Sequence, residues 1–194
     1  KKKDNLYQIF NFLTSRTVVI ENGINIKKIN KKKRSKNFII GKAIRFVDQK
    51  KPELIIDVCN LYKKILTKNK IIFSIAGSGP RYLNFKMLIK KNKLQKLIKL
   101  EGYLSNKKLI KWYKELSLFV NFSSDENLSI SILEAMAIPL PIIATNLKAN
   151  KIICKRKYYG QMPLILIKND PETIYKNIIN LFKNKKLRNK ISKS

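Results

Sequence analysis

The stretch that decides the fold is IIFSIAGSGPRYLNFKMLIKKN, Ile71 to Asn92. It begins with apolar and small residues, turns at two glycines one residue apart, and continues with apolar positions at helical spacing from Arg81. The first part predicts a strand and the last part predicts a helix. A strand, a glycine turn and a helix in this order are typical of a βαβ unit.

The same alternation continues on both sides of this stretch. Further strands are predicted at Thr17–Ile20, Asn37–Val47, Leu97–Leu104, Leu116–Ser123, Pro141–Asn146 and Pro163–Ile167. Further helices are predicted after Pro52, at Asn106–Glu115, from Leu128 or Ser129 onward, and at Pro171–Phe182. Several strands are continuous runs of Ile, Leu, Val and Phe, as in sheets covered on both faces. The predicted fold class is α/β, a doubly wound, Rossmann-like parallel sheet.

Composition excludes several classes of protein. The 194 residues are 44% hydrophobic, which is enough for one core, and the sequence has no histidine, so His-based metal sites and catalytic triads are excluded. No apolar run approaches the ~20 residues of a membrane helix. Cys59 and Cys154 lie in unrelated contexts and are predicted to be buried free thiols. We therefore expect a cytoplasmic protein.

The charge of +31 first indicates a partner with phosphates, such as nucleic acid. Only six of the 43 basic residues are arginines, however, and none of the 43 lies between Glu115 and Leu147, where strand-end loops are predicted. Nucleic-acid readers rely on arginine for bidentate contacts. We interpret the lysines as solvated surface residues that give unspecific, salt-sensitive binding, with no specific nucleic acid. An anionic membrane is a second partner that this charge favours.

In doubly wound sheets, ligands bind outside the carboxyl ends of the strands. The first such loop holds Arg45 and Lys50, five residues apart, whose cations suit a diphosphate, although Lys50 alone is better explained as a surface cation. The second loop holds Gly77 and Gly79, which allow the backbone to approach a ligand. In the third loop, the backbone near Tyr103 can face a base, or the ring simply packs.

The fourth loop and helix, SSDENLSISILEAMA, span Ser123 to Ala137 and contain two glutamates but no lysine. Glu126 precedes the predicted helix, and Glu134 lies about one and a half turns into it. Carboxylates accept hydrogen bonds from the vicinal hydroxyls of sugars and ribose, and the helix start offers free N–H groups to a phosphate. We interpret the two carboxylates as holding different ends of one ligand. The alternative for Glu126 is a helix-capping or helix-dipole role.

ENLSISILEAMAIPLPIIAT resembles the E-x7-E region of retaining glycosyltransferases of the GT-B fold, glycosyl transferases group 1 (family 4). RFVDQKKPELI resembles the diphosphate clamp of that family, FSIAGSGP its glycine turn, and IKLEGYLSNKKLIKWY its base-proximal loop. The resemblance extends from Thr17 to Phe182. The sequence departs from the family at Asn127-Leu128-Ser129, where Gly-Phe-Gly is frequent, and this affects the expected sugar preference.

The resemblance implies a role for each matching residue. Arg45 and Lys50 would hold the donor diphosphate and Glu126 the hydroxyls of the donor sugar, which makes these three the expected catalytic set. Glu134 would bind the ribose. The donor would also contact Gly77, Gly79, the backbone near Tyr103, and the helix start at Asn127, Leu128, Ser129 and Ile130. No metal cofactor is expected, and the anomeric configuration would be retained.

The domain organisation follows from the same resemblance. Residues 1–16 are expected to be a linker or a remnant of an acceptor-binding lobe, 17–182 the nucleotide-sugar-binding domain, and 183–194 a basic tail. The expected partners are a nucleotide-sugar, an acceptor glycan or lipid-linked glycan, and a missing N-terminal acceptor lobe. A peripheral position at the inner face of the plasma membrane fits the charge. The alternatives are a non-enzymatic basic binding domain and an epimerase of the same fold.

Overall fold

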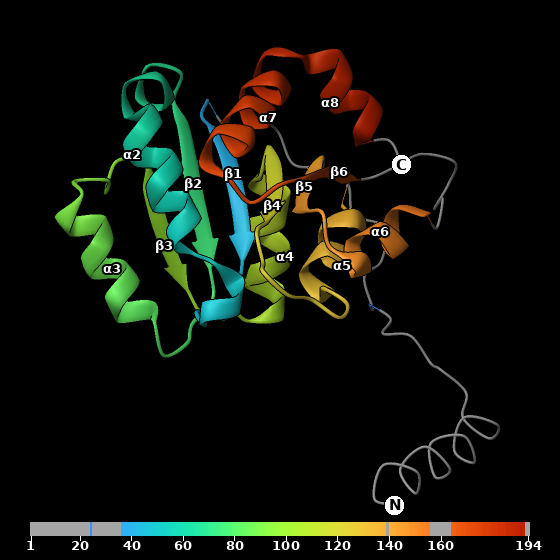
Figure 1. The fold of residues 1–194 in the computed structure, drawn as a ribbon, viewed down its shortest axis with the longest axis horizontal. Helices are drawn as coiled ribbons and strands as arrows, with labels where there is room; N and C mark the ends of the chain where they lie inside the picture. The colour runs from blue at the N-terminus through green and yellow to red at the C-terminus, as the bar shows by residue number, and fades with distance from the viewer. Residues whose placement is uncertain (1–23, 25–35, 139, 156–163, 193–194) are drawn as a thin grey trace, which may run out of the picture.

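The computed structural model describes residues 24, 36–138, 140–155 and 164–192, and these form a layered α/β unit around one parallel sheet (Figure 1). The strands are β1 (Phe38–Ala43), β2 (Ile71–Ala76), β3 (Ile98–Gly102), β4 (Leu118–Asn121), β5 (Ile142–Thr145) and β6 (Leu164–Ile167). Their order is β3-β2-β1-β4-β5-β6, and all neighbours are parallel. This is the Rossmann order, with its topological switch point between β1 and β4. The predicted fold class is confirmed.

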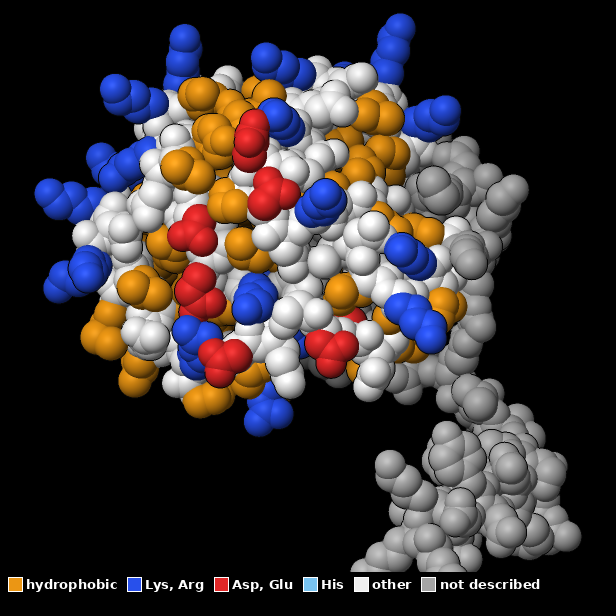
Figure 2. Space-filling model, in the orientation of Figure 1, with side chains coloured by type: hydrophobic (Ala, Val, Ile, Leu, Met, Phe, Trp, Pro, Cys, Tyr) orange, Lys and Arg blue, Asp and Glu red, His pale blue; other side chains and the backbone are white. Residues whose placement is uncertain are grey.

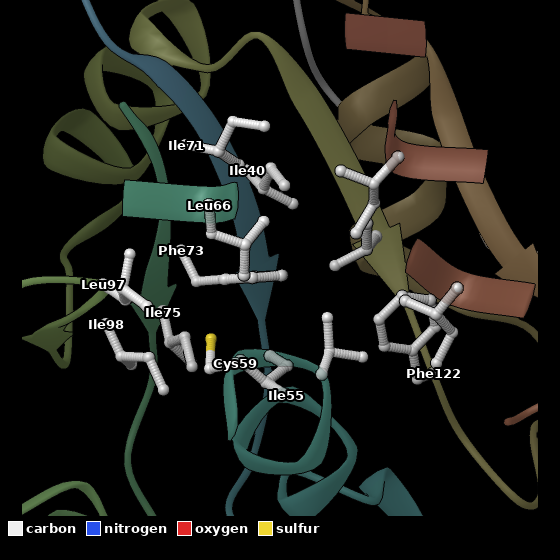
Figure 3. Close-up of a cluster of buried hydrophobic side chains, with 14 of the residues drawn as sticks. Ile40, Ile55, Cys59, Leu66, Ile71, Phe73, Ile75, Leu97, Ile98 and Phe122 are labelled. Atoms are coloured by element: carbon white, nitrogen blue, oxygen red, sulfur yellow. The ribbon is translucent and has the colours of Figure 1, made fainter. Parts of the chain in front are cut away.

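Helices cover both faces of the sheet. One face packs against α2 (Glu53–Lys68), α3 (Tyr82–Lys91), α7 (Pro171–Lys183) and α8 (Lys185–Ile191), and the other against α4 (Asn106–Glu115), α5 (Ile130–Met136) and α6 (Lys148–Lys155). Figure 3 shows the core on the first face, where side chains of β1, β2, β3 and α2 meet. Cys59 lies in this core and Cys154 in the other, both as free thiols, as predicted.

Local sequence signals located most of these elements. Pro52 precedes α2 directly, and the predicted Asn106–Glu115 helix has the bounds of α4. The predicted strand at Thr17–Ile20 lies outside the described residues. No helix in the described part of the chain is long and apolar enough to cross a bilayer.

The segment predicted to be a basic tail contains helix α8. The side chain of Asn184 caps the helix by accepting from the N–H of Leu187 at 2.9 Å. Arg188 lies 5.5 Å from the ring centroid of Phe38 and donates to the carbonyl of Phe182 at 2.5 Å. The contact with Phe38, which is distant in sequence, attaches α8 to β1. Helix α6 was not predicted either.

The two glycines after β2 are required by the chain's own packing. Gly77 has φ +133° and Gly79 has φ +151°, which side chains disfavour. A Cβ at Gly77 would lie 1.7 Å from the carbonyl oxygen of Ile44, and a Cβ at Gly79 2.7 Å from the nitrogen of Phe46. The glycines thus allow a close approach to the loop after β1, and their contact with a ligand stays a prediction. The glycine turn thereby positions the loop that carries Arg45.

On the face of the described residues that Figure 2 shows, basic side chains are spread and do not gather in one patch. In Figure 2, lysine and arginine side chains project around the outline, and acidic side chains form a band across the visible face. Among the described residues, Asp48 and Glu53 pair with Arg81, the second at 2.5 Å. The distribution agrees with our interpretation of the lysines as solvated surface residues.

Candidate functional site

The loops after β1 and β4 meet at the carboxyl edge of the sheet, since both strands are parallel and adjacent. Strand β1 ends at Ala43, so Arg45 lies in the following loop and is exposed. The predicted strand Asn37–Val47, with Arg45 in its apolar end, was wrong there, because β1 stops at Ala43, four residues before Val47. The side chain of Arg45 has no hydrogen-bond or ion-pair partner among the described residues, while its carbonyl accepts from the N–H of Val47 at 2.9 Å. Lys50 ends the short 3-10 helix η1 (Asp48–Lys50).

Glu126 is the centre of the polar contacts at this edge. Its Oε1 lies 2.6 Å from the Nζ of Lys50, 3.0 Å from the Oγ of Ser123 and 3.5 Å from the Nδ2 of Asn121. Its side chain is only 7% exposed. The other oxygen, Oε2, has no hydrogen-bond partner within the described ranges. Because Ser129 occupies the N-cap of α5, the alternative of a capping role for Glu126 is not what the structure shows.

Glu134 lies on α5 and is half-buried. Its Oε2 accepts a hydrogen bond from the hydroxyl of Tyr113 on α4, at 2.9 Å. Burial raises the pKa of Glu134, and the Tyr113 hydrogen bond partly offsets that shift. No partner of Oε1 occurs in the described part of the chain. Tyr113 therefore orients Oε2, and Oε1 is available to accept a hydrogen bond from a ligand.

A residue that the sequence reasoning missed, Lys42, lies beneath Lys50 and Glu126. It is 1% exposed, and its Nζ donates to the carbonyls of Lys50 at 2.7 Å and Phe122 at 2.8 Å. Burial and the Lys50 cation lower the pKa of Lys42 to about 7, against the smaller effects of the Glu126 and Glu53 carboxylates. The available signal was a lysine within FIIGKAI, a strand expected to be buried on both faces.

A second group of polar residues fixes the loop that carries Glu126. Asn121 donates to the hydroxyl of Ser129 at 2.7 Å, and Asn169 donates to the carbonyl of Ser123 at 2.9 Å. Thr145 donates to Asn169 at 2.6 Å. Asn121 and Thr145 are the last residues of β4 and β5, and Asn169 follows β6. Sequence reasoning missed these three because only the strand order brings them together.

The remaining predicted site residues lie at the same edge of the sheet. Tyr103 is 78% exposed in the loop after β3, so the interpretation of its ring as simple packing was wrong. Helix α5 begins at Ile130, one or two residues later than predicted, and Asn127 and Leu128 precede it in the loop. The hydroxyl of Ser129 is held by Asn121 and makes no cap hydrogen bond. Contacts of these residues with a ligand stay predictions.

Comparison with known proteins identifies similar chains. An uncharacterised glycosyltransferase, MJ1178 of Methanocaldococcus jannaschii, is 30% identical over 178 residues, which are 91% of this chain and 46% of that protein. The structure of an S. aureus TarM mutant with fondaparinux, alpha-GlcNAc-glycerol and UDP has a TM-score of 0.72 and 23% identity, over 95% of this chain and 37% of TarM. Anabaena HepE with UDP and glucose has a TM-score of 0.66 and 17% identity, over 81% and 42%.

The chain spans less than half the length of each of these relatives. The structural similarities show that the sheet has the architecture of one Rossmann-like lobe of a GT-B glycosyltransferase. Residues 24–194 match the family described as "Glycosyl transferases group 1". With this match, the E-x7-E region and the Rossmann order of the sheet, the chain belongs to the glycosyl transferases group 1 family.

Proposed function

We propose that this chain binds a nucleotide-diphosphate sugar and supports transfer of the glycosyl group to an acceptor hydroxyl with retention, in the biosynthesis of surface glycans. The observation that carries the proposal is the pattern of contacts at the Glu126 carboxylate. One carboxylate oxygen is held by Lys50, while the other has no partner in the described part of the chain. A carboxylate oriented in this way is suited to accept from sugar hydroxyls.

The other side chains complete the expected donor contacts. Arg45 and Lys50 lie in the loop after β1, where their cations would stabilise the developing charge on the diphosphate leaving group. Glu134, oriented by Tyr113, would accept from the ribose hydroxyls. Because the solved structures of TarM and HepE contain UDP, we take UDP as the first nucleotide to test.

Nucleotide binding is the first test of the proposal. In titration calorimetry, we expect the chain to bind one of UDP, GDP and ADP with measurable affinity that persists at about 0.5 M salt, where exposed charges are largely screened. A non-enzymatic basic domain would instead lose all binding with salt and would not distinguish the three nucleotides. Absence of binding by all three at millimolar concentration would contradict the donor-lobe proposal.

The Arg45→Ala substitution tests the diphosphate contact. We expect about tenfold weaker UDP binding, because a hydrogen bond to a charged group contributes about 1.5–3 kcal/mol and 1.4 kcal/mol corresponds to a factor of ten. Uridine binding should not change, since uridine lacks the diphosphate. The side chain of Arg45 is exposed and has no partner among the described residues, so folding should be unaffected. The matched control is Lys86→Ala on α3, and equal losses for UDP and uridine would reject the clamp.

A further inference from the structure

We propose that Lys42 is a positioning residue of the donor site, whose buried amine holds together the two loops that carry Lys50 and Glu126. This inference rests on the proposed function, because it assigns to those two loops the donor diphosphate and the donor sugar. Lys42 itself lies below the site and would act through its neighbours.

The contacts form a closed ring through two loops that are distant in sequence. From β1, the Nζ of Lys42 reaches the carbonyl of Lys50, eight residues later, and the carbonyl of Phe122, eighty residues later. Above the amine, the side chain of Lys50 returns to Glu126 at 2.6 Å. Each loop is thus held twice, once through its backbone by Lys42 and once through the Lys50–Glu126 ion pair. A shift of either loop would break contacts in both.

The choice of lysine at this position requires an explanation other than packing. Burial of an amine is unfavourable unless its hydrogen bonds are made, and an apolar side chain of similar length would fill the same space in β1. The two carbonyls provide those hydrogen bonds, and the ring of Phe122 lies 5.2 Å from the Nζ. A neutral amine still has two N–H groups, which is enough for two carbonyls. The link between the loops therefore persists in either protonation state.

The test is the Lys42→Met substitution, compared with Lys86→Met on the outer surface of α3. We expect Lys42→Met to bind UDP at least tenfold more weakly in calorimetry and to bind uridine as the wild type does. Amide hydrogen exchange should become faster at residues 48–51 and 122–126, and Lys86→Met should change neither property. Unchanged UDP affinity in Lys42→Met would overturn the proposal, and so would equal loss of UDP and uridine binding.

If Lys42→Met does not fold, NMR of the wild-type chain tests the role of Lys42. A buried, hydrogen-bonded amine exchanges slowly enough to be observed among the solvated lysines. We expect its ¹H–¹⁵N signal to shift when UDP is added and to stay unchanged with uridine, whereas no shift with UDP would reject the role. A wild-type chain that binds none of UDP, GDP and ADP would reject the proposed function as well. Wild-type binding with an unaffected Lys42→Met variant would reject this inference alone.

Discussion

Glu134→Gln should weaken UDP binding by about 10- to 100-fold, because it removes the charge from an oriented hydrogen-bond acceptor, a contact that contributes about 1.5–3 kcal/mol. The amide keeps the size of the carboxylate, and Tyr113 can still donate to its oxygen. Packing of α5 against α4 should therefore survive. Titration calorimetry with UDP measures the loss, and thermal unfolding checks that the variant is folded.

Two further variants identify the cause of that loss. Glu115→Gln, on the exposed end of α4, removes the same charge far from the site and should leave UDP affinity unchanged. Tyr113→Phe keeps the carboxylate but removes the hydroxyl that orients it, so we expect an intermediate loss. If Glu134→Gln binds UDP as tightly as the wild type, the assignment of Glu134 to the ribose is wrong.

Gly77→Ala should destabilise the chain by about 3 kcal/mol or more. The residue has φ +133°, and strained backbone of this kind costs about 1–3 kcal/mol for a residue with a side chain. The added Cβ would also lie 1.7 Å from the carbonyl oxygen of Ile44, so backbone must move, and such overpacking typically costs a further 1–3 kcal/mol or so. Urea unfolding measures the change in the free energy of unfolding.

Gly102→Ala is the matched control for this effect. Gly102 also has positive φ, at +68°, but the nearest atom to an added Cβ is the hydroxyl of Tyr82 at 4.0 Å. Only the conformational cost remains, which is about 1–2 kcal/mol in the left-handed region. Equal destabilisation by the two substitutions would show that the contact with Ile44 is unimportant.

The sequence predicted the sheet well because its signals are local. Apolar runs and glycine turns identified the six strands of the structure, and helical spacing with Pro52 and Pro171 identified helix starts. The prediction from sequence was wrong where contacts between distant residues stabilise an element. Helix α8 forms from a segment that is mostly charged, and Arg188 attaches it to Phe38 in β1.

For the candidate site, the sequence predicted several charged residues but not the ion pairs and hydrogen bonds between them. Lys50 and Glu126 were both assigned to the donor, but their ion pair, across 76 positions of sequence, depends on β1 lying beside β4. Lys42 was missed because it donates to backbone carbonyls, which every residue has and which therefore give no signal in the sequence. Lys50, Glu126 and Glu134 were therefore predictable from sequence, whereas the buried residues that hold them and their hydrogen-bond partners were not.

The Lys50–Glu126 ion pair also has a consequence for discrimination between anions. A chain with net charge +31 attracts polyanions, and Lys50 without its carboxylate partner would bind phosphate groups with less discrimination. A competitor that offers only phosphate must draw Lys50 away and leave Glu126, 7% exposed, without its cation. A ligand that brings phosphate and hydroxyl groups together satisfies both residues at once. Under the proposed function, the ion pair would therefore favour a ligand with both groups over a ligand that offers phosphate alone.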